Sequence, residues 1–478
     1  MSKQSFDALG NQINLTANDF SFVQRDEKIF DTKFETKPTT FLKDAFKRFC
    51  KNKSSVVAAI IIGIIVLFSL LVPTFSIYDI EKAHPSETLL LPKLFESGTG
   101  FWDGTKKVNG VACTYNESEE RWIPIGFEKS NPNSIIDLTT YEKEGVIYCN
   151  FTYDKYEDTY GEQVSTKIAL VNINKYVESG WCLFTYEKVD VNEDGKYKEA
   201  DGDYTTFTFE LTEEGQTLCP VRSISYFNGN KGTGTGIVSR YRELGYEKMP
   251  QYLFGTDNLG RDLVTQCFHG VKSSLVFAIF ISSVCFVFGL IWGSISGYFG
   301  GAVDLLMERF CDILGGVPTV VIVTLFRLHL VKTEKDILWV FALSLCVTGW
   351  MGTAARTRTQ FYRFKGREYV LASRTLGASD GRLIFKHILP NSLGTIVTST
   401  VLMIPGIIFT ESSLSYLGLG LQGSNSFGDI LATNQGFIQT YPMLIIFPAI
   451  IISLLMISFN LFGNGLRDAL NPSLKGSE

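Results

Sequence analysis

Residues 190–201, DVNEDGKYKEAD, carry oxygen-bearing side chains at the spacing that a calcium-binding loop requires. Calcium prefers carboxylate and carbonyl oxygens, and such loops place a glycine where the chain turns sharply. Gly195 falls at that turn, and the candidate ligands are Asp190, Asn192, Asp194, the carbonyl of Lys196, and Asp201. The flanking segments are strand-like rather than helical. The sequence predicts a structural calcium site, and a solvated acidic turn is the alternative.

Four of the nine cysteines, Cys113, Cys149, Cys182 and Cys219, lie in one polar stretch of the chain. If this stretch is outside the cell, disulfides can form there, and four cysteines allow three pairings between which the sequence does not choose. Four buried free thiols are the alternative. The other cysteines lie near or within apolar runs, where we expect them to act as small apolar side chains.

Signs of enzyme chemistry are missing from the sequence. The four histidines, at positions 84, 269, 329 and 387, are too scattered to predict a metal cluster. A Gly-rich phosphate loop ending in Lys-Ser or Lys-Thr is also lacking, so no ATP site is expected in this chain. We therefore expect a protein that is not an enzyme and holds no cofactor of its own apart from the candidate calcium.

Six apolar runs predict a mainly α, polytopic membrane protein. About 20 apolar residues in a helix cross the hydrocarbon core of a bilayer. Five runs lack Asp, Glu, Lys and Arg, and the third holds Arg327, which with His329 is expected to reach the membrane interface. The predicted spans are residues 54–78, 273–303, 313–330, 337–355, 391–410 and 430–466.

Basic residues predict the orientation of these spans. Lys43, Lys47, Arg48, Lys51 and Lys53 precede the first run, against Asp44 alone, which favours a cytoplasmic N-terminus. Six spans then return the C-terminus to the cytoplasm. The predicted organisation is a cytoplasmic tail (1–53), a first span (54–78), an exterior insert (79–272) and a core (273–478) with a cytoplasmic loop at 356–390.

The insert between the first two spans is too long for a simple connection. Segments such as GVIYCNFTYD, TKIALVNINKYV, GWCLFTYEKVDV and YTTFTFELT are rich in Tyr, Thr, Val and Phe, and Gly, Asn and Asp clusters separate them. These are strand signals. We expect a small, mostly β domain on the exterior side.

The loop at 356–390 contains EYVLASRTLGASDGRLIFKHILPN, a polar segment between two spans. Residues 368–376 tolerate a helix, Gly377 can end it with a positive φ, and residues 380–389 can form a second short helix. Pro390 then opens the next span, where its missing N–H is harmless. The predicted product is a helix–turn–helix elbow that projects from the membrane as a docking element.

This segment resembles the EAA loop of ABC importer permeases, and its EYV…AS…LGA variant resembles that of the oligopeptide/dipeptide branch. The matching positions imply ATPase-coupling roles for Glu368, Leu371, Ala372, Ser373, Gly377, Ala378, Leu389 and Pro390. FGTDNLGRDL resembles a segment of the C-type subunit in that branch, which assigns an exterior-face motif to Thr256, Asp257, Gly260, Arg261 and Asp262. ESSLSYLGLG, SFGDIL and NGLRDALNP resemble the end of the same subunit. The insert is outside this resemblance.

The resemblance implies a permease subunit that forms half of a translocation pathway for oligopeptides or dipeptides. Its implied partners are a second permease, two ATPase subunits that bind ATP and Mg²⁺, an exterior binding protein and the lipid bilayer, with no nucleic acid. Asp257 is expected to cap an interfacial helix, and Glu411 to line the mouth of the pathway. The alternatives are an importer of nickel or another small solute, a secondary transporter, and a membrane-anchored sensor or adhesin.

Overall fold

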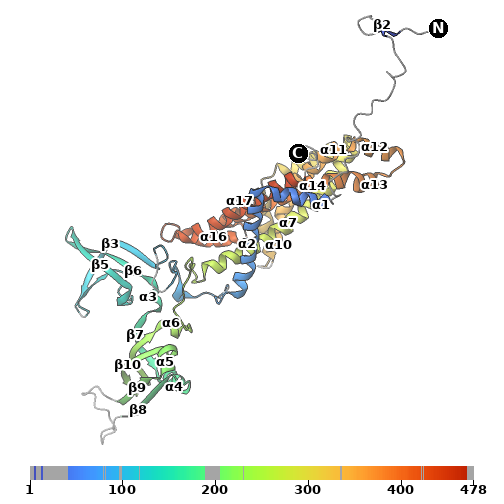
Figure 1. Cartoon of the computed structure of the whole chain (residues 1–478). Coiled ribbons are helices and arrows are strands. Elements are labelled where there is room, and N and C mark those ends of the chain that lie inside the picture. The colour runs from blue at the N-terminus through green and yellow to red at the C-terminus, as the bar shows by residue number, and fades with distance from the viewer. Residues whose placement is uncertain are drawn as a thin grey trace.

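A computed structural model describes residues 41–470 apart from 79, 81, 96–99, 118, 189–204, 230, 334–335, 421–422 and 424. It also describes the backbone of two short paired strands, β1 (Ser5–Phe6) and β2 (Gln12–Ile13). An elongated helical bundle carries a β-rich insert at one end, and the helices α12 and α13 lie at the opposite end (Figure 1). We call these the insert end and the elbow end.

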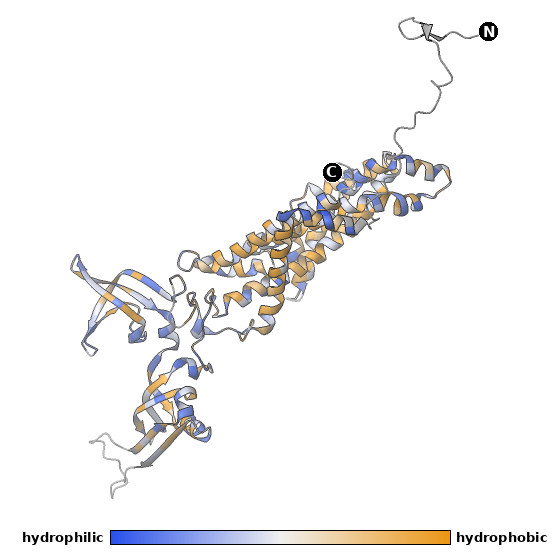
Figure 2. Cartoon of the chain, in the orientation of Figure 1, coloured by the Kyte–Doolittle hydropathy of each residue, from blue (hydrophilic) through white to orange (hydrophobic). Residues whose placement is uncertain are grey.

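Helices that are long and apolar make up the bundle (Figure 2). Five helical stretches could cross a membrane by length and composition, or six if the bent pair α8–α9, with its angle of 74°, counts as one span. The bundle helices are α1 (Phe41–Lys51), α2 (Lys53–Phe75), α7 (Leu263–Phe299), α8 (Gly301–Gly315), α9 (Thr319–Leu330), α10 (Asp336–Gly349), α11 (Met351–Lys365), α14 (Leu389–Val401), α15 (Met403–Tyr416), α16 (Phe427–Asn434) and α17 (Met443–Leu470), and the 3₁₀ turn Gln435–Phe437 follows α16.

The last predicted span is wrong at its start. Residues 430–466 were expected to form one helix, but the chain ends the short helix α16 at Asn434 and begins α17 only at Met443. Gly436 and Pro442 lie between the two helices, and both residues disfavour a helix interior. The Asn434 side chain also donates a hydrogen bond to the carbonyl of Ile430 (2.9 Å).

Three glycines on α7 explain how closely α7 and α11 pack together. Gly289, Gly293 and Gly297 recur every fourth residue and so share one face of the helix. A Cβ at these positions would lie 2.6, 2.3 and 2.6 Å from atoms of α11, closer than real side chains approach. Small residues at this spacing let helix backbones approach closely within a membrane.

The insert lies between α2 and α7 and has two lobes (Figure 1). The first lobe is an antiparallel sheet in the order β4-β3-β6-β5, and the second combines the sheet β10-β11-β7 with the hairpin β8-β9. The strands are β3 (Thr105–Asn116), β4 (Arg121–Pro124), β5 (Ile135–Lys143), β6 (Val146–Asp154), β7 (Glu162–Ala169), β8 (Cys182–Lys188), β9 (Thr205–Leu211), β10 (Val221–Asn228) and β11 (Thr233–Ser239).

Short helices connect these strands, and one of them corrects the prediction. The segment TKIALVNINKYV was expected to be a strand, but the chain switches to helix α4 at Leu170. Ile173 is buried, and Leu170, Tyr176 and Val177 pack in the same core at helical spacing, so this part of the segment follows a helical period. The connecting helices are η3 (Pro85–Glu87), η4 (Pro132–Ser134), α3 (Lys155–Tyr160), α4 (Leu170–Glu178), α5 (Glu213–Leu218) and α6 (Arg240–Glu243).

Candidate functional site

The elbow has the first helix and the turn at Gly377 that the sequence predicts, but its second helix is not separate from the next span, because Asp380–Tyr416 is one helical stretch that continues through Pro390. Helix α12 (Glu368–Thr375) ends at Gly377, whose φ of 82° is in the left-handed region. The N–H of Gly377 donates to the carbonyl of Arg374 (3.0 Å), and that of Ala378 donates to the carbonyl of Ser373 (3.1 Å). This pair of hydrogen bonds defines the Schellman motif, in which the residue after the helix end has a positive φ and is most often glycine. Helix α13 (Asp380–Arg382), the π-helix η5 (Leu383–Ile388) and α14 follow.

A small buried cluster joins the elbow to the bundle. Val370, Leu383 and Ile388 are completely buried and pack with Phe361 of α11 and Tyr298 of α7. The Tyr298 hydroxyl donates to Asp380 (2.5 Å) and accepts from Arg374 (3.3 Å). The elbow is therefore fixed to the last turns of two membrane-spanning helices.

The outer surface of the elbow carries large apolar side chains. Leu376 is 88% exposed, Phe385 69% and Leu371 45%. Of the residues expected to couple to an ATPase, Glu368, Leu371, Ala372, Gly377 and Pro390 are exposed, whereas Ser373, Ala378 and Leu389 are half-buried. Leu376 and Phe385 were missed because no sequence pattern separates an outward apolar residue from an inward one in such short helices.

Asp304 braces the same end of the bundle. Its carboxylate accepts two hydrogen bonds from Arg358 (2.5 and 2.6 Å), one from the Tyr362 hydroxyl (2.7 Å) and one from the Ser296 hydroxyl. These contacts join α7, α8 and α11. The predicted orientation places the segment around position 304 in the cytoplasm, where an excess of Lys and Arg is expected rather than acidic residues. The structure pairs Asp304 with Arg358.

The TDNLGRD motif forms a clamp at the insert end. Asp257 is 2% exposed and accepts hydrogen bonds from the backbone N–H groups of Leu259 and Arg261 (both 2.9 Å) and from the Arg261 side chain (2.8 Å). The Arg261 Nη1 group also donates to Asn425 (2.9 Å), which precedes α16. The motif therefore binds the start of α7 to the chain before α16.

The prediction that Asp257 caps an interfacial helix is wrong. Asp262 is the N-cap of α7 and accepts from the Thr265 N–H (2.8 Å), while Asp257 stabilises a closed turn in which Thr256 and Asp262 are bridged. Gly260 has a φ of 78°, and a Cβ there would lie 2.0 Å from the His84 carbonyl oxygen. The motif is compact because its own carboxylates satisfy its N–H groups.

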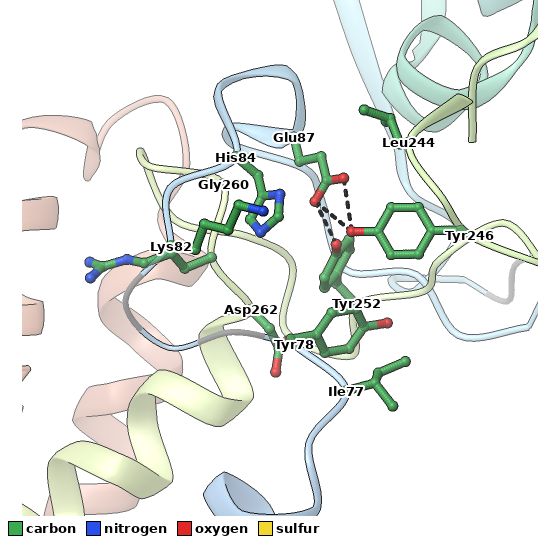
Figure 3. A pocket seen from close by; sticks show the side chains of 11 residues that line it. Ile77, Tyr78, Lys82, His84, Glu87, Leu244, Tyr246, Tyr252, Gly260 and Asp262 are labelled. Atoms are coloured by element: carbon green, nitrogen blue, oxygen red, sulfur yellow. Dashed lines mark hydrogen bonds between the residues drawn. The ribbon is translucent and has the colours of Figure 1, made fainter. Parts of the chain in front are cut away.

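The clamp borders a cavity of about 270 Å³ (Figure 3). On one wall the buried Glu87 accepts hydrogen bonds from the hydroxyls of Tyr246 (3.0 Å) and Tyr252 (2.9 Å). Burial, followed by the charge of Glu87, raises the pKa of Tyr246 to about 12. Both phenols therefore remain donors at neutral pH, and they join the two ends of the insert.

Glu411 lies in a separate polar cluster inside the bundle. It is fully buried and accepts hydrogen bonds from Ser274 (3.0 Å), Ser415 (3.2 Å) and Ser426 (2.7 Å). Ser426 is the N-cap of α16. The expectation that Glu411 lines an open mouth is wrong for this conformation, because hydroxyl groups from α7, α15 and α16 surround it.

The structure describes the four candidate disulfide cysteines but not the candidate calcium ligands. Cys113 lies near Cys149 and Cys182 near Cys219, and all four are buried free thiols. Burial and the neighbouring Cys113 raise the pKa of Cys149 to about 12, and burial and Cys219 raise that of Cys182 to about 11.

The candidate calcium ligands, residues 190–201, lie outside the described residues. Near the end of α9, Arg327 donates to the Gly418 carbonyl (2.5 Å).

Two protein families match parts of this chain. The family described as "Binding-protein-dependent transport system inner membrane component" matches residues 289–476. A second description, "N-terminal TM domain of oligopeptide transport permease C", matches residues 40–92. Neither match reaches residues 93–288, which hold most of the insert.

Three permease proteins are similar in sequence to this chain. The chain is 42% identical to the oligopeptide transport system permease protein OppC of Bacillus subtilis, over 46% of this chain and 72% of that one. It is 40% identical to the dipeptide transport system permease protein DppC of the same organism, over 46% and 69%, and 36% identical to DppC of Lactococcus lactis, over 52% and 72%. Among solved structures, it is similar to an inward-facing methionine ABC transporter MetNI, at 17% identity over 43% of this chain and 96% of that one, with a TM-score of 0.38.

The family matches and the permease relatives define a multi-pass membrane protein of the transporter class and not an enzyme. The chain belongs to the family of inner-membrane components of binding-protein-dependent transport systems, in its oligopeptide/dipeptide branch. It is a permease subunit of an ABC importer.

Proposed function

We propose that this permease subunit forms half of a pathway that imports oligopeptides or dipeptides. The observation that carries the proposal is the identity to the OppC and DppC permeases of Bacillus subtilis, at 42% and 40%. A second permease completes the pathway, two separate ATPases supply ATP hydrolysis, and a binding protein delivers the peptide.

We place the insert outside the cell and both chain ends in the cytoplasm, with six spans in which α8 and α9 form one. The basic residues before α2 support this orientation, because Lys and Arg concentrate in cytoplasmic segments. The elbow end is also rich in them, with Arg356, Arg358, Arg363 and Lys365 on α11 alone. Reporter fusions at the C-terminus and in a loop of the insert test the placement, and equal accessibility of both from outside would contradict it.

The elbow is the coupling element in this proposal. Leu376 and Phe385 are exposed apolar side chains on a short helical projection, which suits insertion into a cleft of an ATPase subunit. Displacement of the elbow would act on α7 through the Tyr298–Asp380 hydrogen bond, and on α11 through contact with Phe361. The Asp304 brace would then make α7, α8 and α11 move as one unit.

Uptake measurements test the assignment directly. Cells that lack the native system and express this chain with its partner subunits should accumulate labelled di- and oligopeptides. Excess unlabelled peptide should compete, and excess nickel should not. Competition by nickel alone, with no peptide uptake, would replace the peptide assignment by that of a metal importer. Purification of the chain with two ATPases and a second permease would support the assembly.

A further inference from the structure

A group of large apolar side chains lies at the base of the insert, where its chain meets the bundle. They come from two segments distant in sequence: Leu94 is 36% exposed, Phe95 61%, Phe101 61%, Trp102 36% and Leu253 40%. We call these five side chains the apron. A cluster of exposed large apolar side chains on one surface marks a site of interaction.

Hydrogen bonds assemble the apron into one surface. The Leu94 N–H donates to the Trp102 carbonyl (3.1 Å), and the Trp102 indole N–H donates to the Leu253 carbonyl (3.0 Å). The Phe95 N–H donates to the side chain of Gln251 (3.1 Å). Because the indole N–H already has an acceptor, the ring can leave water without losing a hydrogen bond.

Contacts with α17 set the level of the apron. The ring of Phe101 lies 6.1 Å from that of Phe447, which stacks on Phe254 at 4.1 Å. Phe447 is close to the start of α17, the candidate span Met443–Leu470. A helix rises about 1.5 Å per residue, so Phe447 lies roughly 6 Å from the beginning of this span. The apron is therefore level with the end of a membrane-spanning helix.

Helix α2 connects the apron to the lipid-facing side of the bundle. Leu253 lines a surface hollow together with Val72, Phe75 and Ile77, at the end of α2. Only 22% of the apolar window of α2 is buried in the protein. Its exposed side chains include Ile60 (56%), Ile64 (47%) and Phe75 (77%). The apolar side chains at the end of α2 and Leu253 of the apron therefore line the same hollow, which also contains polar residues such as Ser76 and Gln251.

We propose that the apron inserts into the interfacial zone of the lipid bilayer, in the leaflet at the insert end. Aromatic side chains accumulate at this depth, where an apolar ring and a satisfied polar group are both accommodated. The hollow that Leu253 shares with the lipid-facing helix α2 favours lipid over a protein partner.

This attachment has a consequence for the insert. Its first lobe also contacts the chain between α16 and α17, since Lys106 and Lys155 lie 4.6 and 5.9 Å from the centre of the Tyr441 ring. Lipid on one side and Tyr441 on the other hold the base of the insert in place. The lobe then stays beside α16, whose N-cap residue contacts Glu411, instead of swinging freely.

Site-specific photo-crosslinking tests the proposal and depends only on membrane insertion, not on which solute is carried. The full chain, expressed with its partner subunits, receives p-benzoylphenylalanine in place of Phe95 or Phe101, and membranes are irradiated. The same label at Ile64 is the lipid-facing control. At Val164, which is 73% exposed on β7, it is the control for an exposed insert residue away from the apron.

Intact mass then identifies the adduct. Labels at 95 and 101 should gain the mass of one phospholipid, at a yield within about threefold of that at Ile64, and the label at Val164 should give at least tenfold less. Adducts of subunit size would assign the apron to a protein partner and overturn the proposal. So would lipid adducts at Ile64 alone.

Discussion

The insert end and the elbow end of the bundle differ in which side chains they bury and which they expose. At the insert end three carboxylates are buried and hydrogen-bonded within the chain: Asp257 is 2% exposed, Glu87 1% and Glu411 0%. At the elbow end apolar side chains point outward, and Leu376 is 88% exposed. These three carboxylates of the insert end are satisfied within the chain, and the exposed apolar side chains of that end form the apron, whereas those of the elbow end lie on a short helical projection.

This difference shows which buried polar groups hold the insert end to the bundle and which apolar surfaces at each end need a cover of their own. A chain of contacts from Asp257 through Arg261, Asn425 and Ser426 to Glu411 joins the insert end to the bundle. Buried polar networks with all members satisfied specify one arrangement. The exposed leucine and phenylalanine of the elbow gain a stabilising environment only when another surface covers them.

The largest effect is expected at the elbow. Gly377→Arg forces an L side chain to a φ of 82°, which costs about 1–2 kcal/mol and favours another elbow geometry. Uptake should fall about tenfold or more, while the protein stays in the membrane and its partner ATPases continue to hydrolyse ATP. Transport of labelled peptide and ATPase activity, measured on the same preparations, check this uncoupling.

A pair of alanine variants isolates the backbone effect. A Cβ at Gly377 or at Gly381 would meet no atom within 4 Å, but only Gly377 has a positive φ. Gly377→Ala should therefore lower uptake several-fold, and Gly381→Ala should leave it unchanged. Normal uptake with Gly377→Arg would remove the coupling role of the elbow.

The largest effect on stability, rather than on transport, is expected from loss of the clamp at the insert end. Arg261→Ala leaves the buried carboxylate of Asp257 without its cation, and breaking a buried pair in this way costs about 3–5 kcal/mol. The midpoint of thermal unfolding in detergent should fall by many degrees. Arg309→Ala is the matched control, because its pair with Asp312 is 70% and 56% exposed and is worth about 0–1 kcal/mol. Equal effects of the two variants would show that burial does not distinguish the two ends.

The cysteines of the insert offer a smaller test. The structure places Cys113 beside Cys149 in the first lobe and Cys182 beside Cys219 in the second, which selects one of the three pairings. In an oxidising exterior, each thiol pair should lose two electrons and two protons to a thiol oxidant and form a disulfide. Peptide mapping without reductant should recover these two bridges, each worth about 2–4 kcal/mol. Bridges between the lobes, or four free thiols in protein from native membranes, would contradict the pairing or the exterior placement.

The smallest expected effect concerns calcium. If residues 190–201 bind the ion, millimolar calcium should stabilise the full chain by about 1–2 kcal/mol when its concentration is roughly ten times the dissociation constant. The shift in thermal midpoint should vanish in the Asp190→Ala, Asp194→Ala double variant, and magnesium should give little shift because it dehydrates reluctantly. An equal shift in the double variant would place the ion elsewhere.

Local patterns predicted much of the fold. The apolar runs located the membrane helices, and the strands in GVIYCNFTYD and YTTFTFELT formed as expected. The turn of the elbow followed from Gly377, because glycine takes a positive φ without steric cost, whereas the helix break expected before Pro390 did not form. Helix α4 was predicted as a strand because a short apolar run fits either structure. The break between α16 and α17 was missed because a run without charged residues hid Gly436 and Pro442, which disfavour a helix interior.

The sequence by itself determined the class of this protein, the approximate positions of most of its apolar helices and the turn of its elbow at Gly377. These depend on side-chain polarity and backbone restriction, which act within a few residues. Only the tertiary structure decided that Asp262 rather than Asp257 caps α7, that Arg261 reaches Asn425, and that Glu411 is buried among serines. Such contacts join residues as far as 164 positions apart, and their partners are selected by how helices and loops meet in space.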